Sequence, residues 1–164
     1  MAAAGSALPA DLVLDTSVVV AWAFREATRW ELARDVIAEV ACGAVVAYVP
    51  ELFWPEFQQA CVNKHHRRPQ ERDALGVPWA NVDAAYAAAD ALPLEEVPVV
   101  AELRDDAWLL RRHLEVGGND AYFLSLARGF GLELWTFDVN LCGLLAVDPA
   151  LRAMVKHVGV DVTW

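Results

Sequence analysis

Short apolar runs alternate with longer stretches of helical periodicity along this chain. Leu12-Val13-Leu14 is apolar at every position, which is typical of a strand that is buried on both faces of a sheet. Between Leu32 and Val40 the apolar residues instead recur on one helical face, and Gly43 follows as a helix-ending residue. The same criteria predict strands over residues 12–14, 44–49, 94–99, 133–137 and 155–158, and helices from about residue 18 and over 28–42, 51–66, 83–91, 100–116, 119–129 and 141–146.

Strands that alternate with helices predict an α/β fold. We expect a three-layer α/β/α sandwich whose central sheet is mainly parallel and covered by helices on both faces. Thr16 or Ser17 is expected to cap the first helix, and Asn119 the helix that follows Gly117-Gly118. Residues 1–10 are expected to be a flexible lead-in and residues 11–164 a single domain, whereas the segment 67–80 is predicted to be irregular.

The composition supports a folded, acidic domain. Hydrophobic residues make up 57% of the 164 residues and charged residues 22%, the opposite of the balance found in disordered chains. Lysine and arginine number 13 against 23 aspartates and glutamates, so the formal net charge is −10. A charge of this sign argues against a protein that holds nucleic acid by bulk electrostatics alone, but it suits carboxylates that bind a metal ion.

The sequence shows no membrane or export signal. No apolar stretch is long enough to span a membrane, and the first ten residues lack the basic start and apolar run of a signal peptide. Cys42, Cys61 and Cys142 are far apart and lie among apolar neighbours. Neither a disulfide framework nor a zinc site fits this pattern, so we expect buried free thiols and a cytoplasmic protein.

Four acidic residues are predicted to meet at one edge of the sheet. The carboxyl ends of parallel strands share that edge with the N-termini of the helices that connect them. Asp15 and Asp138 end predicted strands, whereas Glu56 and Asp120 lie in the first turns of predicted helices. Four crowded carboxylates repel one another, and a hard divalent cation such as Mg²⁺ or Mn²⁺ is the simplest compensation. Such a site binds phosphate oxygens and activates water, which predicts phosphodiester hydrolysis.

Each of the four acids, taken singly, is also compatible with a structural role. Any one aspartate at a strand end or helix start is accounted for by helix capping, so the joint placement of all four is what favours a site. An aspartyl phosphatase of the haloacid-dehalogenase kind, with Asp15 as the nucleophile, is disfavoured because Ser17 stands where that chemistry needs a second aspartate. A binding module without turnover is disfavoured because all four acids are present.

Four segments resemble, in chain order, the motifs of the PIN-domain nucleases, most closely the VapC-like ribonuclease toxins of toxin–antitoxin pairs. They are LVLDTSVVVAWAF, VPELFWPEF, NDAYFLSLA, and LWTFD followed by Val139-Asn140-Leu141. The resemblance covers Leu12 to about Gly159 and implies a PIN-like sandwich with an acidic Mg²⁺ or Mn²⁺ pocket. It also implies an RNA substrate, a homodimer and a cognate antitoxin. It carries over Asp15, Glu56, Asp120 and Asp138 as the metal-site acids, and Thr16, Ser17 and Thr136 as supporting polar residues.

Basic and aromatic residues suggest where partners would bind. Lys64, Arg67 and Arg68 form a cluster that either contacts RNA phosphates or an acidic antitoxin segment, or is simply the solvated end of a helix. Among the seven tryptophans, Trp22 and Trp135 are expected in the core. The tryptophans that are candidates for a dimer or antitoxin groove are Trp30, Trp54, Trp79 and Trp108.

Overall fold

The computed structural model describes residues 8–66 and 76–161. This part of the chain contains a five-stranded sheet in the order β3-β2-β1-β4-β5, in which every neighbouring pair of strands is parallel. The strands are β1 (Asp11–Leu14), β2 (Val46–Pro50), β3 (Leu94–Val97), β4 (Glu133–Thr136) and β5 (Val155–His157). The helices are α1 (Thr16–Ala23), α2 (Trp30–Ala41), α3 (Phe53–His65), α4 (Trp79–Asp90), α5 (Ala101–Leu114), α6 (Gly118–Phe130), α7 (Val139–Leu144) and α8 (Pro149–Met154), with a 3₁₀ turn over Leu145–Val147.

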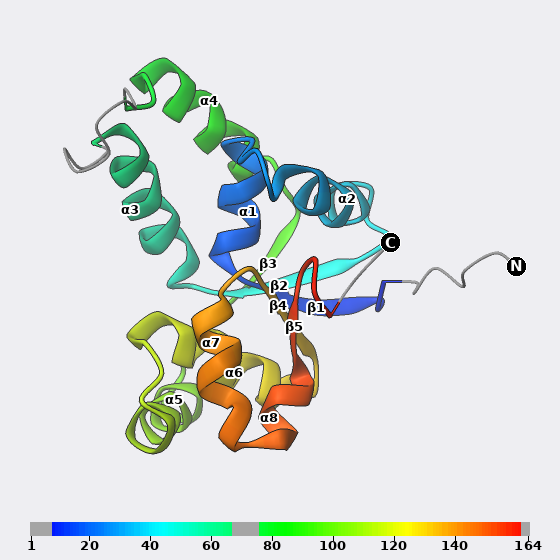
Figure 1. The fold of residues 1–164 in the computed structure, drawn as a ribbon, viewed down its shortest axis with the longest axis vertical. Helices are drawn as coiled ribbons and strands as arrows, with labels where there is room; N and C mark the ends of the chain where they lie inside the picture. Colours follow the sequence, from blue (N-terminus) through cyan, green and yellow to red (C-terminus); the bar gives the residue numbers. More distant parts are fainter. Residues whose placement is uncertain (1–7, 67–75, 162–164) are drawn as a thin grey trace, which may run out of the picture.

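Helices cover both faces of this sheet. Figure 1 shows α1 to α4 on one side of the strands and α5 to α8 on the other. Helix α1 packs against α2, α3 and α4, whereas α6 contacts β1, β2 and β4. The predicted three-layer α/β/α sandwich is therefore confirmed, and the sheet that was expected to be mainly parallel is parallel throughout its described strands.

The strand order places β1 and β4 side by side at the centre of the sheet. From β1 the chain builds outward through β2 and β3, then returns to β4 on the other side of β1. The connections therefore leave the carboxyl ends of β1 and β4 in opposite directions, and such a switch point opens a crevice at that edge of a parallel sheet. The backbone amide of Asp15 donates to the carbonyl oxygen of Trp135 at 3.0 Å and holds the two strand ends together.

Apolar residues from the strands and from one face of the helices form the core. Leu12, Val13 and Leu14 of β1 are fully buried, as expected of a central strand that is covered on both faces. Phe53 and Phe57 of α3 are also fully buried, and their rings stack with centroids 5.8 Å apart. These rings anchor the first turn of α3 in the core, because tightly packed aromatic side chains leave little room for movement.

Two helix caps differ from the predicted ones. Asp15 caps α1 in place of Thr16 or Ser17, because its carboxylate accepts a hydrogen bond from the Ser17 amide at 3.2 Å. Helix α6 begins directly after Gly117, so Asn119 lies inside its first turn. An aspartate caps a helix as well as serine or threonine does, so the local rule could not choose among three adjacent polar residues.

The structure also adds one helix and moves the start of another. Helix α8 is absent from the predicted elements because its six residues are too few to show helical periodicity. Asp148 caps it by accepting two backbone amides, and Pro149 occupies its first turn. Helix α4 begins at Trp79 instead of Asp83, and residues 67–75 of the predicted irregular segment lie outside the described part.

Three further expectations concern the cysteines, the N-terminus and membranes. Cys61 and Cys142 are buried as predicted, but Cys42 is exposed because it lies at the point where α2 ends. Of the predicted lead-in, residues 1–7 lie outside the described part, and β1 begins at Asp11. Within the described residues, every helix is too short or too polar to cross a membrane.

Replacing Phe123 by alanine is expected to lower the free energy of unfolding by about 3–5 kcal/mol, because this ring on α6 is fully buried and its loss leaves a cavity. Phe130 lies at the end of the same helix and is 51% exposed, so Phe130→Ala is the matched control, with an expected loss of about 1 kcal/mol or less. Urea denaturation measures both values. Equal losses in the two variants would contradict the assignment of the buried face of α6.

Candidate active site

Four acidic residues from separate segments meet at the carboxyl edge of the sheet. Asp15 follows β1 and Asp138 follows β4, while Glu56 and Asp120 lie in the first turns of α3 and α6. Burial is the main cause of a raised pKa at Asp120, and the charges of Asp15 and Asp138 add to it. Burial likewise leads at Glu56, where the charges of Asp15 and Asp120 also raise the pKa. Because such interactions weaken with distance, the structure brings together the acids that the sequence predicts.

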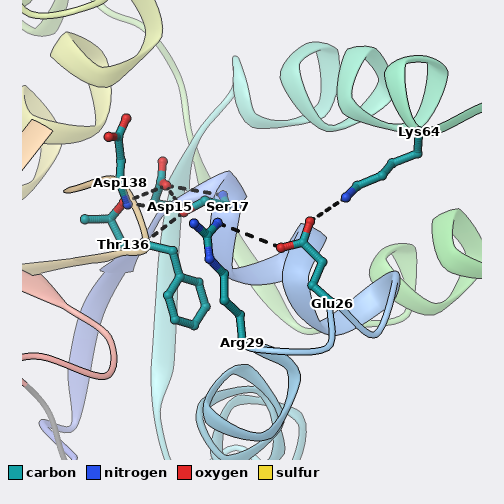
Figure 2. A network of polar contacts seen from close by, with 8 residues as sticks. Asp15, Ser17, Glu26, Arg29, Lys64, Thr136 and Asp138 are labelled. Atoms are coloured by element: carbon teal, nitrogen blue, oxygen red, sulfur yellow. Dashed lines mark hydrogen bonds and ion pairs between the residues drawn. The ribbon is translucent and has the colours of Figure 1, made fainter. Parts of the chain in front are cut away.

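Asp15 is the most enclosed of these acids, with 6% of its surface exposed. Ser17 donates its backbone amide and its hydroxyl to Oδ2 of Asp15, and Thr136 donates its hydroxyl to the same oxygen at 2.9 Å (Figure 2). Burial raises the pKa of Asp15 more than these hydrogen bonds lower it, and the charge of Asp138 raises it further. Two of the predicted supporting residues, Ser17 and Thr136, therefore contact an acid directly.

The same two hydroxyls join the ends of β1 and β4. The amide of Phe137 donates to Oγ of Ser17 at 3.0 Å, and the amide of Asp138 donates to Oγ1 of Thr136 at 2.9 Å. Each hydroxyl thus accepts from the chain after β4 while it donates to Asp15. The positions of the segments that carry Asp15 and Asp138 are therefore coupled through two side chains.

Glu56 is half-buried at the start of α3. Thr16, the third predicted supporting residue, donates its hydroxyl to Oε2 of Glu56 at 2.8 Å. Asn119 of α6 also forms a hydrogen bond with this carboxylate. Burial nevertheless raises the pKa of Glu56 more than these donors lower it. The sequence identifies Asn119 only as a helix cap, because its contact with Glu56 depends on where α3 and α6 meet.

Asp120 and Asp138 complete the acidic group. The pKa of Asp120 is raised to about 6, chiefly by burial. A Cβ at Gly117 would lie 2.4 Å from Oδ2 of Asp120, so a larger residue at this position would displace that carboxylate. Asp138 caps α7 through Oδ1, which accepts backbone amides at 2.7 and 3.1 Å. Helix capping thus accounts for the hydrogen bonds of Oδ1 of Asp138. Within the described part of the chain, no donor bonds to its Oδ2.

A sequence model of the PIN domain matches residues 12–144, a segment that includes all four acids. This chain belongs to the PIN-domain family. A search among curated proteins gives no match. The family that the sequence motifs resemble is therefore confirmed.

Solved structures that share the fold of this PIN domain include toxin–antitoxin proteins. A toxin–antitoxin complex from Klebsiella pneumoniae has a TM-score of 0.57 at 14% identity, over 88% of this chain and 95% of that one. VapBC2 from Rickettsia felis, bound to a DNA fragment from its promoter, has a TM-score of 0.59 at 15% identity, over 90% and 98%. VapC20 from Mycobacterium tuberculosis, a sarcin–ricin loop cleaving toxin, has a TM-score of 0.58 at 20% identity, over 80% and 93%. At these identities the likeness shows a common fold.

The acidic group of this PIN domain has the donor chemistry of a hard-cation site. Carboxylate oxygens are the ligands that Mg²⁺ and Mn²⁺ prefer in proteins. Among residues 8–66 and 76–161, no three His, Cys, Asp or Glu side chains stand close enough to form a ready-made set of metal ligands. Burial is the leading cause of the raised pKa values of Asp15, Glu56 and Asp120, and the charges of neighbouring carboxylates raise them further, so a bound cation would offset both effects. The residues present therefore fit a divalent cation in type and in charge.

The basic cluster is only partly described. Lys64 donates to Oε1 of Glu26 at 2.5 Å and has a side chain that is 23% exposed, whereas Arg67 and Arg68 lie outside the described residues. Glu26 also faces the guanidinium of Arg29 at 3.8 Å. The sequence patterns single out neither Glu26 nor Arg29, since both lie in the turn between α1 and α2 and belong to no motif.

Asp120→Asn is expected to raise the free energy of unfolding of the metal-free protein near pH 7. The pKa of Asp120 rises from the ordinary 3.8 to about 6 on folding, so the folded state binds the proton more tightly than the unfolded state does. Stability from this group is therefore fully present below about pH 4 and is lost as the pH rises through about 6. The difference in free energy of unfolding between Asp120→Asn and the wild type should accordingly disappear near pH 4.

Urea denaturation in EDTA across this pH range tests the prediction. The control is Asp105→Asn on the neighbouring helix α5, whose side chain is 71% exposed and pairs only with Arg104 at the surface. A gain in Asp120→Asn that is equally large at both ends of the pH range would contradict the burial and repulsion assigned to this carboxyl.

Proposed function

We propose that this PIN domain is a divalent-cation-dependent endoribonuclease that hydrolyses RNA phosphodiester bonds in the cytoplasm, as the toxin of a toxin–antitoxin pair. The observation that carries the proposal is the meeting of four carboxylates at the switch point of the sheet, with raised pKa values at three of them. Membership of the PIN-domain family supports nuclease chemistry. The toxin–antitoxin proteins among the solved structures support the biological role.

Asp15, Asp120 and Asp138 are the proposed ligands of Mg²⁺ or Mn²⁺, and Glu56 either joins them or orients the attacking water. When bound, such a cation supplies charge compensation, polarisation of the phosphate and a lowered pKa of water. In the hydrolysis a water oxygen bonds to phosphorus, the bond from phosphorus to the leaving oxygen breaks, and that oxygen takes up a proton. No covalent intermediate with the protein is proposed.

The protein's own contribution is to orient the acids and to offset part of the cost of burying their charge. Ser17 and Thr136 bond to one oxygen of Asp15, and no described residue donates to its other oxygen. Thr16 fixes Oε2 of Glu56 in the same way. Hydroxyl donors orient a carboxylate without neutralising it, so the negative charge remains available to a cation.

An apolar groove supports the proposal of an antitoxin partner. It has a volume of about 580 Å³ between α1, α2 and α4. Its apolar lining comes from Trp22, Phe24 and Trp30 together with alanines of α4, and Arg25 and Asn81 are its polar residues. Trp22, expected in the core, is half-buried and lines this groove, whereas Trp135 is buried as predicted. A groove of this composition suits the apolar face of an amphipathic helix, which is the segment we propose the antitoxin provides.

Exposed apolar side chains support a homodimer. Trp108 and Leu109 of α5 are 60% and 47% exposed, and Phe130 at the end of α6 is also exposed. Aromatic side chains are enriched in protein interfaces, so we propose that exposed side chains of α5 and of the end of α6 contact a second copy of the chain. Of the two alternative functions, the aspartyl phosphatase is disfavoured because the chain matches the PIN-domain family. Assays of RNA cleavage distinguish a nuclease from a binding module without turnover.

Asp138→Asn is expected to lower kcat/KM for RNA cleavage by about 100-fold or more, because asparagine lacks the charge needed at a metal site. Asp148→Asn is the matched control, since Asp148 caps α8 with the same two-amide geometry by which Asp138 caps α7. Asparagine caps as well as aspartate, so the two variants should have similar Tm values. Cleavage of a labelled RNA measures the rates, and equal activities would show that Asp138 is only a cap.

Removal of divalent metal with EDTA is expected to abolish cleavage, and added Mn²⁺ should restore it, because the acids repel the RNA backbone without a cation. Asp15→Asn should weaken Mn²⁺ binding by about tenfold or more in calorimetry. Cleavage that survives EDTA, or that persists in Asp15→Asn, would contradict the proposed site. Tight Mn²⁺ binding with no cleavage of any RNA would favour the binding module.

A further inference from the structure

Three charged residues form a chain of ion pairs beside the acidic group. Lys64 of α3 bonds to Glu26 at 2.5 Å, and Glu26 faces Arg29 at 3.8 Å; we call these residues the Lys64–Glu26–Arg29 triad. Figure 2 shows the triad next to Asp15 and Ser17, with the guanidinium of Arg29 lying between Glu26 and that cluster in this view. The triad contains two positive charges and one negative charge, so it is a locally cationic feature in a chain of net charge −10.

Glu26 is held rigidly at the centre of the triad. Arg25 has a φ of 49°, and this left-handed residue allows the Glu26 amide to donate back to the carbonyl of Ala21 at 2.9 Å. The carbonyl of Glu26 in turn accepts the amides of Arg29 and Trp30 at 2.9 and 2.8 Å. A non-glycine residue costs energy in this conformation, so the surrounding contacts must impose the turn. The turn therefore fixes the position from which the Arg29 side chain starts.

The Arg29 guanidinium is directed to the edge of the sheet by an aromatic ring. Its Cζ lies 5.4 Å from the centre of the Phe137 ring, and the Phe137 amide donates to Ser17 Oγ at 3.0 Å. Ser17 in turn donates to Asp15, and Phe137 directly precedes Asp138, so the ring that Arg29 contacts lies next to two of the four acids. Stacking on a ring holds a guanidinium by its face and leaves the N–H groups at its rim available.

These N–H groups are not used within the described protein. The contact with Glu26 is a charge pair at 3.8 Å, and no hydrogen bond joins the Arg29 guanidinium to another described residue. Lys64 already compensates much of the Glu26 charge, and the Arg29 side chain is 45% exposed. Arg34 of the helix that follows, α2, differs in this respect, because its Nε and Nη2 both donate to Asp35.

We propose that Arg29 binds a phosphate of the RNA strand beside the acidic group, and that Glu26 is a positioning residue held by Lys64. This assignment rests on the proposed ribonuclease function and names the residue that offsets repulsion between the acids and the substrate. The planar guanidinium presents paired N–H donors that match two phosphate oxygens, and its positive charge complements theirs. RNA is favoured over an acidic protein segment because Arg29 lies against the residues that hold Asp15 and not in the apolar groove.

Arg29→Gln is expected to raise the KM for cleavage of a labelled single-stranded RNA by about tenfold, with a smaller effect on kcat, because one charged hydrogen-bonded contact is lost. Binding of the same RNA, followed by fluorescence anisotropy with Ca²⁺ in place of Mn²⁺ to slow turnover, should weaken to a similar degree. The slope of log Kd against log salt should fall by about 0.7, as expected for one phosphate contact on a single strand. Arg29→Lys should retain part of the affinity, and Glu26→Gln should lose a part.

Arg34→Gln is the matched control, since Arg34 of α2 is likewise exposed, paired with a carboxylate and stacked on a ring. The KM of this variant should stay within about twofold of the wild type. Equal KM values in the two arginine variants would overturn the assignment of Arg29 while leaving the proposed function intact. Weaker Mn²⁺ binding in Arg29→Gln with unchanged RNA affinity would also overturn it, as would displacement of the RNA by polyglutamate at equal concentration. Failure of the wild type to bind or cleave RNA would refute the proposed function and this assignment together.

Discussion

The burial of the Asp15 carboxylate is the constraint on which the rest of this site depends. Asp15 emerges from the central strand of a parallel sheet, where water is excluded by neighbouring strands and by helices on both faces. Burial penalises its charge, and three hydrogen bonds from Ser17 and Thr136 offset part of that penalty. Because the same hydroxyls accept amides from the chain after β4, these contacts also set the geometry of the switch point.

The backbone at the remaining acids offsets part of the free-energy cost of their negative charge. Glu56 and Asp120 lie in the first turns of 13-residue helices, where the helix dipole favours a negative charge. Asp138 receives two backbone amides at the start of α7. Helix dipoles and neutral donors lower the free-energy cost of a buried, charged carboxylate, but they bring no net positive charge that would cancel it. Burial and mutual repulsion outweigh these effects at Glu56 and Asp120, whose pKa values are raised, so the apolar core has to supply the stability that this crowding removes.

The acidic character of the whole chain and an RNA substrate are compatible once charge is considered locally. A formal charge of −10 describes the molecule, whereas a phosphate at the sheet edge would meet a few groups within one Debye length. Those groups are the acids, which suit a cation, and the Lys64–Glu26–Arg29 triad, which is itself cationic. Recognition of RNA by this arrangement would be local and cation-dependent, in contrast to proteins that bind through an extended basic surface.

The sequence by itself determined the fold class and most of the helices and strands, and it predicted that the four acids lie at one edge of the sheet. Strand and helix periodicity are local properties, and Asp15 and Asp138 could be recognised because they directly follow apolar strands. Only the tertiary structure decided that β1 and β4 are neighbours, that Asn119 bonds to Glu56, and that Glu26 lies between two cations. These contacts join residues far apart in the chain; the Thr136 hydroxyl, for example, reaches an acid 121 positions away. No local pattern encodes such a pairing, because it depends on how whole helices and strands pack.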